Sequence, residues 1–163
     1  TVVGRIMRIF TSHSTDDTHS FGRRLASLLE VGDLVLLTGD LGAGKTIMSK
    51  GIAKGLGVVE TVTSPTFAIA NVFRGRLELN HLDVYRFDSA EEVYEAFDIS
   101  EMLESGVVLV EWGELIQEHL GDEYLEVKLS YSQHDSQRTI ELKPLGEKWL
   151  GRLSSSTLVE GIT

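Results

Sequence analysis

The sequence predicts a single α/β domain in which a mixed sheet is flanked by helices and carries antiparallel hairpins. Two apolar runs, 34–37 and 107–110, have the character of buried strands. The first is followed by the glycine-rich segment 39–46 and then by a helical pattern over 47–56. Strand pairs with short turns interrupt a pure strand–helix alternation. Together these observations favour a P-loop NTPase-like domain over an all-parallel fold.

Length and charge limit the possible organisation and partners. A chain of 163 residues forms one comfortable domain, so we expect residues 1–163 to be one unit with a flexible tail from about residue 154. The balance of 15 basic against 25 acidic side chains gives a net charge of −10. This charge repels nucleic acid, so we expect no direct tight binding to it, and a role with RNA would run through a protein partner.

The composition also excludes several site types. The chain has no cysteine, which rules out disulfides and thiolate metal sites. No apolar stretch is long enough to span a membrane, and the first residues lack the order of a secretion signal. We therefore expect a cytoplasmic protein that does not bind membranes.

The first third of the chain predicts a short edge strand, a helix and the strand–loop–helix unit. Residues 6–10 suggest the edge strand. Residues 14–17 supply an N-cap and early acidic charge for a helix that carries Phe21, Leu25 and Leu28 at helical spacing. Gly57 ends the helix that follows the glycine-rich segment.

The middle of the chain predicts a loop, a hairpin and two helices. Pro65 forbids a central strand over 62–67, so this stretch is expected to be a loop close to the phosphates. Residues 67–73 and 77–84 alternate as the two strands of a hairpin. Helices are expected over 90–97 and 99–103.

The last third predicts one more helix, a second hairpin and a closing helix. Residues 112–120 look helical after the apolar run 107–110. Residues 124–131 and 138–142 form the predicted hairpin, and 147–153 the final amphipathic helix.

The glycine-rich segment has the residues that phosphate binding needs. Glycines let successive backbone N–H groups turn toward one anion. Lys45 adds a positive charge, and Thr46 offers a hydroxyl to Mg²⁺. The alternative is a glycine-rich turn that binds nothing, but the strand before it and the helix after it favour a P-loop.

Two acids are candidates for holding the metal or orienting water. Asp83 ends one predicted strand, and Glu111 ends the apolar run 107–110. Ligand groups of open α/β sheets gather at the carboxyl ends of strands, so we expect both acids to serve the site. Glu111 has the usual form of a metal-anchoring acid, with Asp83 in the same metal or water shell. The alternatives are that Asp83 caps a turn and pairs with Arg86, and that Glu111 caps the next helix.

Other side chains have weaker signals. Ser64 or Thr66 can report the γ-phosphate, or simply form a turn beside the proline. His81 is more consistent with a hydrogen-bonded structural residue than with a base. Trp112 is either core or neighbour of the site. Arg138 and Arg86 are candidates for phosphate or partner contacts, although surface arginines are common.

Four motifs in this order and spacing resemble the bacterial TsaE family, the ATPase of tRNA N6-threonylcarbamoyladenosine biosynthesis. The resemblance runs from about Ser12 to Leu153, and its motifs are residues 39–46, 64–67, 81–86 and 111–114. Four linked motifs are far more specific than one glycine-rich loop.

The resemblance implies a P-loop domain that binds ATP and Mg²⁺, hydrolyses ATP slowly alone, and works with the TsaD and TsaB proteins that modify adenosine 37 of tRNAs reading codons that begin with A. It implies support of repeated turnover without transfer of the threonylcarbamoyl group by this chain. By motif, Thr46 and Glu111 serve Mg²⁺, Asp83 assists the metal or water, and Thr18 lies near the nucleotide. The remaining phosphate-holding residues implied are Leu41, Gly42, Ala43, Gly44 and Lys45.

The chain departs from the family pattern at two positions. Ile47 stands where a second Thr is common, and Gly113 where a Pro often follows the Trp. Neither position supplies an essential ligand, so these departures concern fine positioning.

Three rival functions share the phosphate-binding signal. A small-molecule kinase needs an acceptor pocket and usually an arginine-rich lid, and no such cluster is evident. A GTPase needs an Asn-Lys-x-Asp segment, which is absent. A nucleotide-gated binding module with incidental hydrolysis is the alternative that the sequence excludes least.

Overall fold

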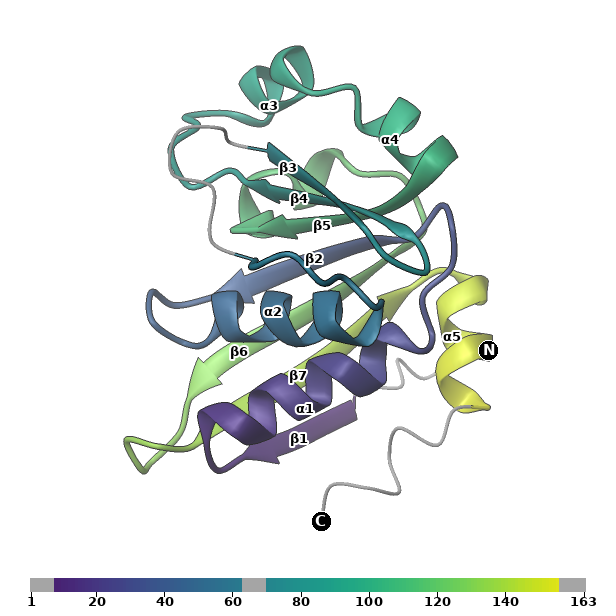
Figure 1. Cartoon of the computed structure of the whole chain (residues 1–163). Coiled ribbons are helices and arrows are strands. Elements are labelled where there is room, and N and C mark those ends of the chain that lie inside the picture. The colour runs from purple at the N-terminus through teal and green to yellow at the C-terminus, as the bar shows by residue number, and fades with distance from the viewer. Residues whose placement is uncertain (1–7, 63–69, 156–163) are drawn as a thin grey trace, which may run out of the picture.

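A computed structural model of the chain describes residues 8–62 and 70–155. Its described strands form one seven-stranded sheet with the spatial order β1-β7-β6-β2-β5-β4-β3 (Figure 1). The strands are β1 (Arg8–Ser12), β2 (Leu34–Gly39), β3 (Ala70–Arg74), β4 (Glu78–Asp83), β5 (Gly106–Glu111), β6 (Tyr124–Tyr131) and β7 (Arg138–Leu145).

Helices cover both faces of the sheet. In Figure 1, α1 and α2 lie together across one face, while α3 and α4 lie beside the β3–β5 half. The helices are α1 (Thr15–Ala26), α2 (Lys45–Gly55), α3 (Ala90–Ala96), α4 (Ile99–Ser105) and α5 (Glu147–Ser154), with the 3₁₀ segments η1 (Gly113–Leu115) and η2 (Gln117–His119).

The centre of the sheet is parallel and its margins are antiparallel. Strands β6, β2, β5 and β4 run parallel to one another, whereas β3 on one side and β7 and β1 on the other pair antiparallel. Both faces of β5 are covered, which explains its continuous apolar run. The carboxyl ends of β2, β4 and β5 therefore meet at one edge of the sheet.

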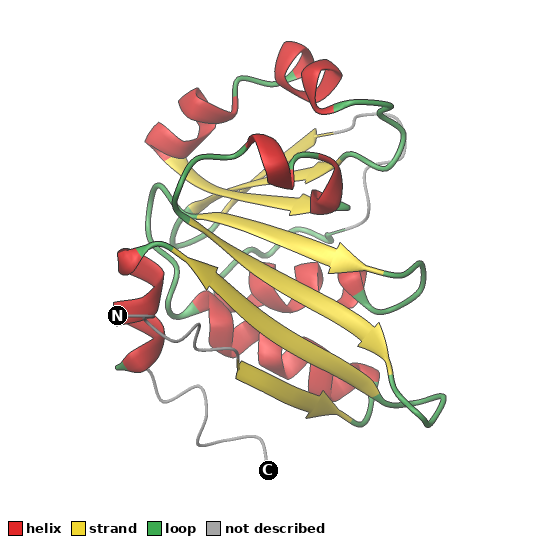
Figure 2. Cartoon of the chain, turned by 180° about the vertical axis from the view of Figure 1, so that it is seen from behind, coloured by secondary structure: helices red, strands yellow, loops and turns green. Residues whose placement is uncertain are grey.

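The β6–β7 hairpin is covered on one face. Leu125, Val127 and Leu129 of β6 are fully buried and pack into the core beneath α1 and α2. Figure 2 shows the back of β6, β7 and β1 without a helix over it. Lys128 and Ser130 alternate with the buried residues, so the alternation in the sequence records which face meets water.

Serine and aspartate caps fix where three helices begin. The side chains of Ser14, Ser89 and Asp98 accept hydrogen bonds from backbone N–H groups of the first turns of α1, α3 and α4. These caps are local sequence signals, and the helix starts follow them.

The α/β fold class and both predicted hairpins are confirmed. The helix predicted over 112–120 is wrong, because the chain there forms only η1 and η2. Trp112 has φ +64°, and the Gly113 backbone packs against Leu36, so the chain turns sharply where a helix would begin. Residues 6–7 and 67–69 of two predicted strands, and the expected tail from 156 onward, lie outside the described residues.

Across residues 8–62 and 70–155, no helix is both long and apolar enough to cross a bilayer.

Candidate functional site

The loop between β2 and α2, residues 39–46, is built on three glycines with left-handed backbone. Gly39, Gly42 and Gly44 have φ values of +124°, +76° and +109°, a region that other residues rarely adopt. A Cβ on Gly39 would also collide with the carbonyl oxygen of Leu129. The glycine spacing of this glycine-rich loop is therefore required by its conformation.

The loop delivers the chain directly into the first turn of α2. Gly44 is the N-cap residue and provides no side-chain hydrogen bond to the helix. The first N–H groups of a helix lack partners within the helix and carry the positive end of its dipole. This terminus therefore suits an anionic group.

Lys45 is buried beside the loop. It is 5% exposed, and its Nζ donates to the carbonyl oxygens of Gly39 and Asp40, both at 2.7 Å. The same ammonium lies 3.8 Å from the centre of the Trp112 ring. Burial lowers the pKa of Lys45, while Glu114, the largest opposing influence, raises it. The lysine is thus held at the loop as a partly desolvated cation.

Thr46 and the two strand-end acids lie at the carboxyl edge of the parallel sheet. Glu111 is the register partner of Leu37 in β2 and of Asp83 in β4. Thr46 Oγ1 donates to Glu111 Oε1 at 3.2 Å. The hydroxyl after the lysine and the carboxylate that ends β5 are therefore in contact.

Asp83 and Glu111 have different surroundings. Burial raises the pKa of Asp83, the backbone N–H of Tyr85 opposes this, and the nearby Glu111 raises it further. Asp83 Oδ1 accepts that N–H at 3.0 Å, so one oxygen of Asp83 is used locally. Glu111 is 2% exposed. No described contact makes Glu111 the cap of the helix that follows it.

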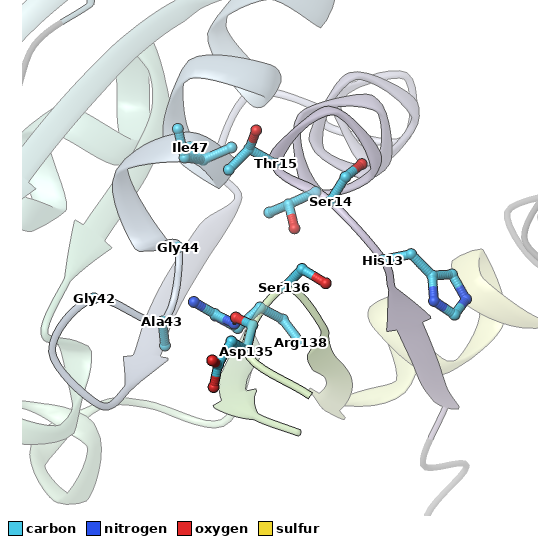
Figure 3. Close-up of a pocket in the computed structure, with 11 residues that line it drawn as sticks. His13, Ser14, Thr15, Gly42, Ala43, Gly44, Ile47, Asp135, Ser136 and Arg138 are labelled. Atoms are coloured by element: carbon cyan, nitrogen blue, oxygen red, sulfur yellow. The ribbon is translucent and has the colours of Figure 1, made fainter. Parts of the chain in front are cut away.

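A cavity of about 380 Å³ opens on the other side of the glycine-rich loop. Its walls come from the β1–α1 junction, the loop and the tip of the β6–β7 hairpin, and Figure 3 shows these segments around one space. The lining residues are His13, Ser14, Thr15, Thr18, Gly42, Ala43, Gly44, Ile47, Asp135, Ser136 and Arg138.

The hairpin wall of this cavity is also tied to the loop. The Tyr131 hydroxyl donates to the carbonyl oxygen of Leu41 at 2.5 Å. The Arg138 guanidinium lies 4.5 Å from the centre of the Tyr131 ring, and its Nη1 donates to the backbone of Asp135 and Gln137. The crest of the loop is thereby fastened to the β6–β7 hairpin.

The predicted site residues fall into two groups on either side of the loop. Thr18, Arg138 and the residues 42–44 share the cavity, whereas Lys45, Thr46, Asp83 and Glu111 gather at the strand ends. The Leu41 side chain is 71% exposed at the crest of the loop, so the part of Leu41 available to a bound phosphate is its backbone. Thr66 lies outside the described residues.

The sequence leaves the role of one loop-contacting residue, Trp112, open and assigns no role to two others, Glu114 and Tyr131. The Trp112 ring faces Lys45, which places this residue beside the site. Glu114 accepts the Gly39 N–H at 3.0 Å. Tyr131 comes from a hairpin distant in the sequence, so only strand pairing brings it to the loop. Glu114 was within the motif 111–114, which was the one available signal.

Comparisons with known proteins agree on one family. A family model described as threonylcarbamoyl adenosine biosynthesis protein TsaE matches residues 12–140. The chain is 42% identical over 134 residues to the tRNA threonylcarbamoyladenosine biosynthesis protein TsaE of Streptomyces coelicolor, covering 78% of this chain and 90% of that protein. It is 38% identical over 136 residues to the TsaE protein of Bacillus subtilis, covering 82% and 84%.

A solved structure is similar over nearly the whole length. The crystal structure of Bacillus subtilis YdiB superimposes with a TM-score of 0.77 and 31% identity, covering 94% of this chain and 95% of that chain. Sequence and fold therefore lead to the same conclusion, and the chain belongs to the TsaE family.

Proposed function

We propose that this protein is a Mg²⁺-dependent ATPase that supports threonylcarbamoyl modification of tRNA adenosine 37 together with TsaD and TsaB. The observation that carries the proposal is the contact between Thr46, which opens α2 directly after the glycine-rich loop, and Glu111 at the end of β5. A P-loop uses these two positions to bring a metal beside bound phosphates.

The residues fit the triphosphate. The glycine-rich loop offers backbone N–H groups at a helix start that has no side-chain cap, and its glycines at 39, 42 and 44 have the left-handed backbone that such a loop needs. Lys45 brings a buried cation to the loop. These features supply the dense array of donors that a phosphate chain needs. Thr18 and Arg138 line the cavity beyond the loop, where the nucleoside would lie.

The residues also fit Mg²⁺. Among the described residues, no group of three or more His, Asp and Glu side chains is arranged to hold a metal by itself. Mg²⁺ commonly binds through one or two protein oxygens, phosphate oxygens and water. The side-chain oxygens of Thr46, Glu111 and Asp83 are metal ligands of this kind. When bound, the ion would neutralise charge that develops on the phosphates during hydrolysis.

The family supplies the pathway, and the site suggests the contribution of this chain. The relatives are named for threonylcarbamoyladenosine biosynthesis, and the net charge of −10 disfavours direct tRNA binding. Partner proteins would then carry the tRNA, and hydrolysis here would drive an assembly or conformational step between turnovers. The product of this chain alone would be ADP and phosphate.

ATP turnover tests the proposal in three mixtures: the chain alone, the chain with candidate small acceptors, and the chain with TsaD and TsaB. The proposal predicts slow hydrolysis alone and stimulation only by the two proteins. Phosphate transfer to a small acceptor would instead identify a kinase. The same measurement on Glu111→Ala should show strongly reduced turnover in the complex, and full activity would remove Glu111 from the site.

A further inference from the structure

Glu111 is a buried carboxylate whose two oxygens have different partners. Oε1 accepts from Thr46 at 3.2 Å, and Oε2 lies 2.5 Å from His81 Nε2. A buried carboxylate needs hydrogen bonds on both oxygens to offset the loss of water. The pair of contacts therefore fixes the plane of the carboxylate as well as its position.

His81 reaches Glu111 from the neighbouring strand. It lies in β4 with Leu109 of β5 as its register partner, two residues before Glu111. Alternation puts residues two apart on the same face of a strand, and Leu109 packs in the core beneath α2. His81 thus lies on the face from which Thr46 approaches Glu111.

The hydrogen-bond chemistry defines what His81 does. A carboxylate only accepts, so Nε2 carries the proton and donates to Glu111. Nδ1 is buried and has no partner among the described residues. His81 is fully buried, and the nitrogen on the Glu111 side is already used, so it has no direct route to an attacking water. This arrangement suits orientation of a neighbour and not proton transfer.

We propose that His81 is a positioning residue that holds Glu111 so that Oε1 faces Thr46 and the metal ion. This inference rests on the proposed function, because the metal site is part of it. Removing the hydrogen-bond partner of a metal-binding carboxylate typically lowers the affinity for the metal about 10- to 100-fold. The metal-dependent part of nucleotide binding should therefore depend on His81, and the metal-independent part should not.

Calorimetric titration of ADP, in EDTA and in Mg²⁺, separates these two parts. His81→Phe keeps the bulk of the ring and removes the donor, and it should reduce the gain in affinity that Mg²⁺ brings by about tenfold. Affinity in EDTA should stay within about twofold, since the loop and Lys45 are untouched. His81→Gln places a side-chain N–H near the position of Nε2 and should restore most of the gain.

Asn80→Leu is the matched control. Asn80 is a buried polar residue of the same strand, and its side chain donates to the Val107 carbonyl at 3.2 Å, away from Glu111. Its loss should lower stability and leave the Mg²⁺ gain at the wild-type value. If His81→Phe does not fold, His81→Asn replaces it, because the shorter amide cannot reach Glu111.

Two results would overturn the role of His81 while leaving the proposed function intact: an unchanged Mg²⁺ gain in the donor-less variant, or an equal loss of affinity with and without metal. Absence of any nucleotide binding by the wild-type protein would instead contradict the proposed function itself.

Discussion

At the strand ends, an acid that suits metal binding can also lower the stability of the fold. Burial and the nearby Glu111 both raise the pKa of Asp83, so the fold disfavours its ionised form. Above its raised pKa, Asp83 therefore lowers the free energy of unfolding relative to a neutral residue. A bound cation would reverse this cost, which is a common compromise at functional sites.

Asp83→Asn should stabilise the nucleotide-free protein and impair hydrolysis. The sign follows from linkage: Asp83 is protonated in both states below its unfolded pKa, and the full cost is present above the raised folded pKa. The rise in melting temperature that Asp83→Asn brings should thus be larger at about pH 7.5 than at about pH 5. Thermal unfolding in EDTA checks this.

In the same variant, ATP turnover with Mg²⁺ should fall by at least about tenfold. Asp88→Asn, an exposed acid in the loop before α3, is the control and should change neither quantity appreciably. A less stable Asp83→Asn at neutral pH would contradict the account of this acid.

Short motifs in the sequence encode some of the site residues, whereas contacts made through tertiary structure are not visible in it. Lys45, Thr46 and Glu111 were identifiable because short-range motifs encode them. The contact of Lys45 with Trp112 was not, since it depends on a left-handed φ at Trp112 that no local pattern announces. The hydrogen bond from His81 to Glu111 depends on the register of β4 on β5.

At the scale of elements, α1 and α2 approach with their backbones in contact. A Cβ on Gly22 would lie 2.7 Å from the Met48 carbonyl oxygen, and one on Gly55 2.5 Å from that of Arg23. The same holds at Gly51, which faces the His19 backbone. These glycines allow α2, and with it the glycine-rich loop, to lie close to α1 and the cavity.

Gly51→Ala should lower the free energy of unfolding by about 1–3 kcal/mol, because the added methyl group meets backbone that cannot rotate away. Gly151→Ala is the matched control. Gly151 lies within α5, and a Cβ there would meet nothing within 4 Å. The substitution should therefore raise the free energy of unfolding by about 0.5–1 kcal/mol through helix propensity.

Urea unfolding of the two alanine variants gives both values. Equal effects at the two positions would show that helix contact does not limit residue size at Gly51.

The elements themselves were predictable where periodicity and caps agreed. Ser14 and Ser89 mark helix starts in the sequence and in the structure. The apolar spacing of residues 112–120 predicts a helix. In the structure, however, Gly113 packs on Leu36 and the chain forms 3₁₀ segments. Tertiary contact overrides local preference there.

At the scale of the whole molecule, α5 closes the fold through a buried acid. Asp33 is fully buried before β2, where Arg152 Nη1 donates to it at 2.5 Å and Lys148 approaches at 3.1 Å. Arg152 also pairs with Glu30. The C-terminal helix is thereby fixed to the segment that leads into the glycine-rich loop's strand.

Arg152→Ala should lower the free energy of unfolding by about 2 kcal/mol, because it leaves Asp33 buried with Lys148 as its remaining cation. Arg24→Ala, an exposed arginine of α1, should change the free energy of unfolding by less than about 0.5 kcal/mol. Chemical unfolding of both variants compares them, and indistinguishable midpoints would show that α5 is not held by Asp33.

The whole architecture could be predicted only in outline. The fold class follows from apolar runs and hairpin turns, but the spatial order of strands does not, because pairing of β6 with β2 joins segments far apart in the chain. That pairing brings the β6–β7 hairpin to the glycine-rich loop, where Tyr131 contacts Leu41 and Arg138 lines the cavity.

We propose that the glycine-rich loop binds ATP together with Mg²⁺, and calorimetric titration of a non-hydrolysable ATP analogue measures this binding. We expect the wild-type protein to bind the analogue more tightly in Mg²⁺ than in EDTA. Lys45→Ala should weaken binding by about tenfold to a hundredfold, because it removes a charge-assisted contact to phosphate. Unchanged affinity in Lys45→Ala, or no binding by the wild type, would contradict the claim.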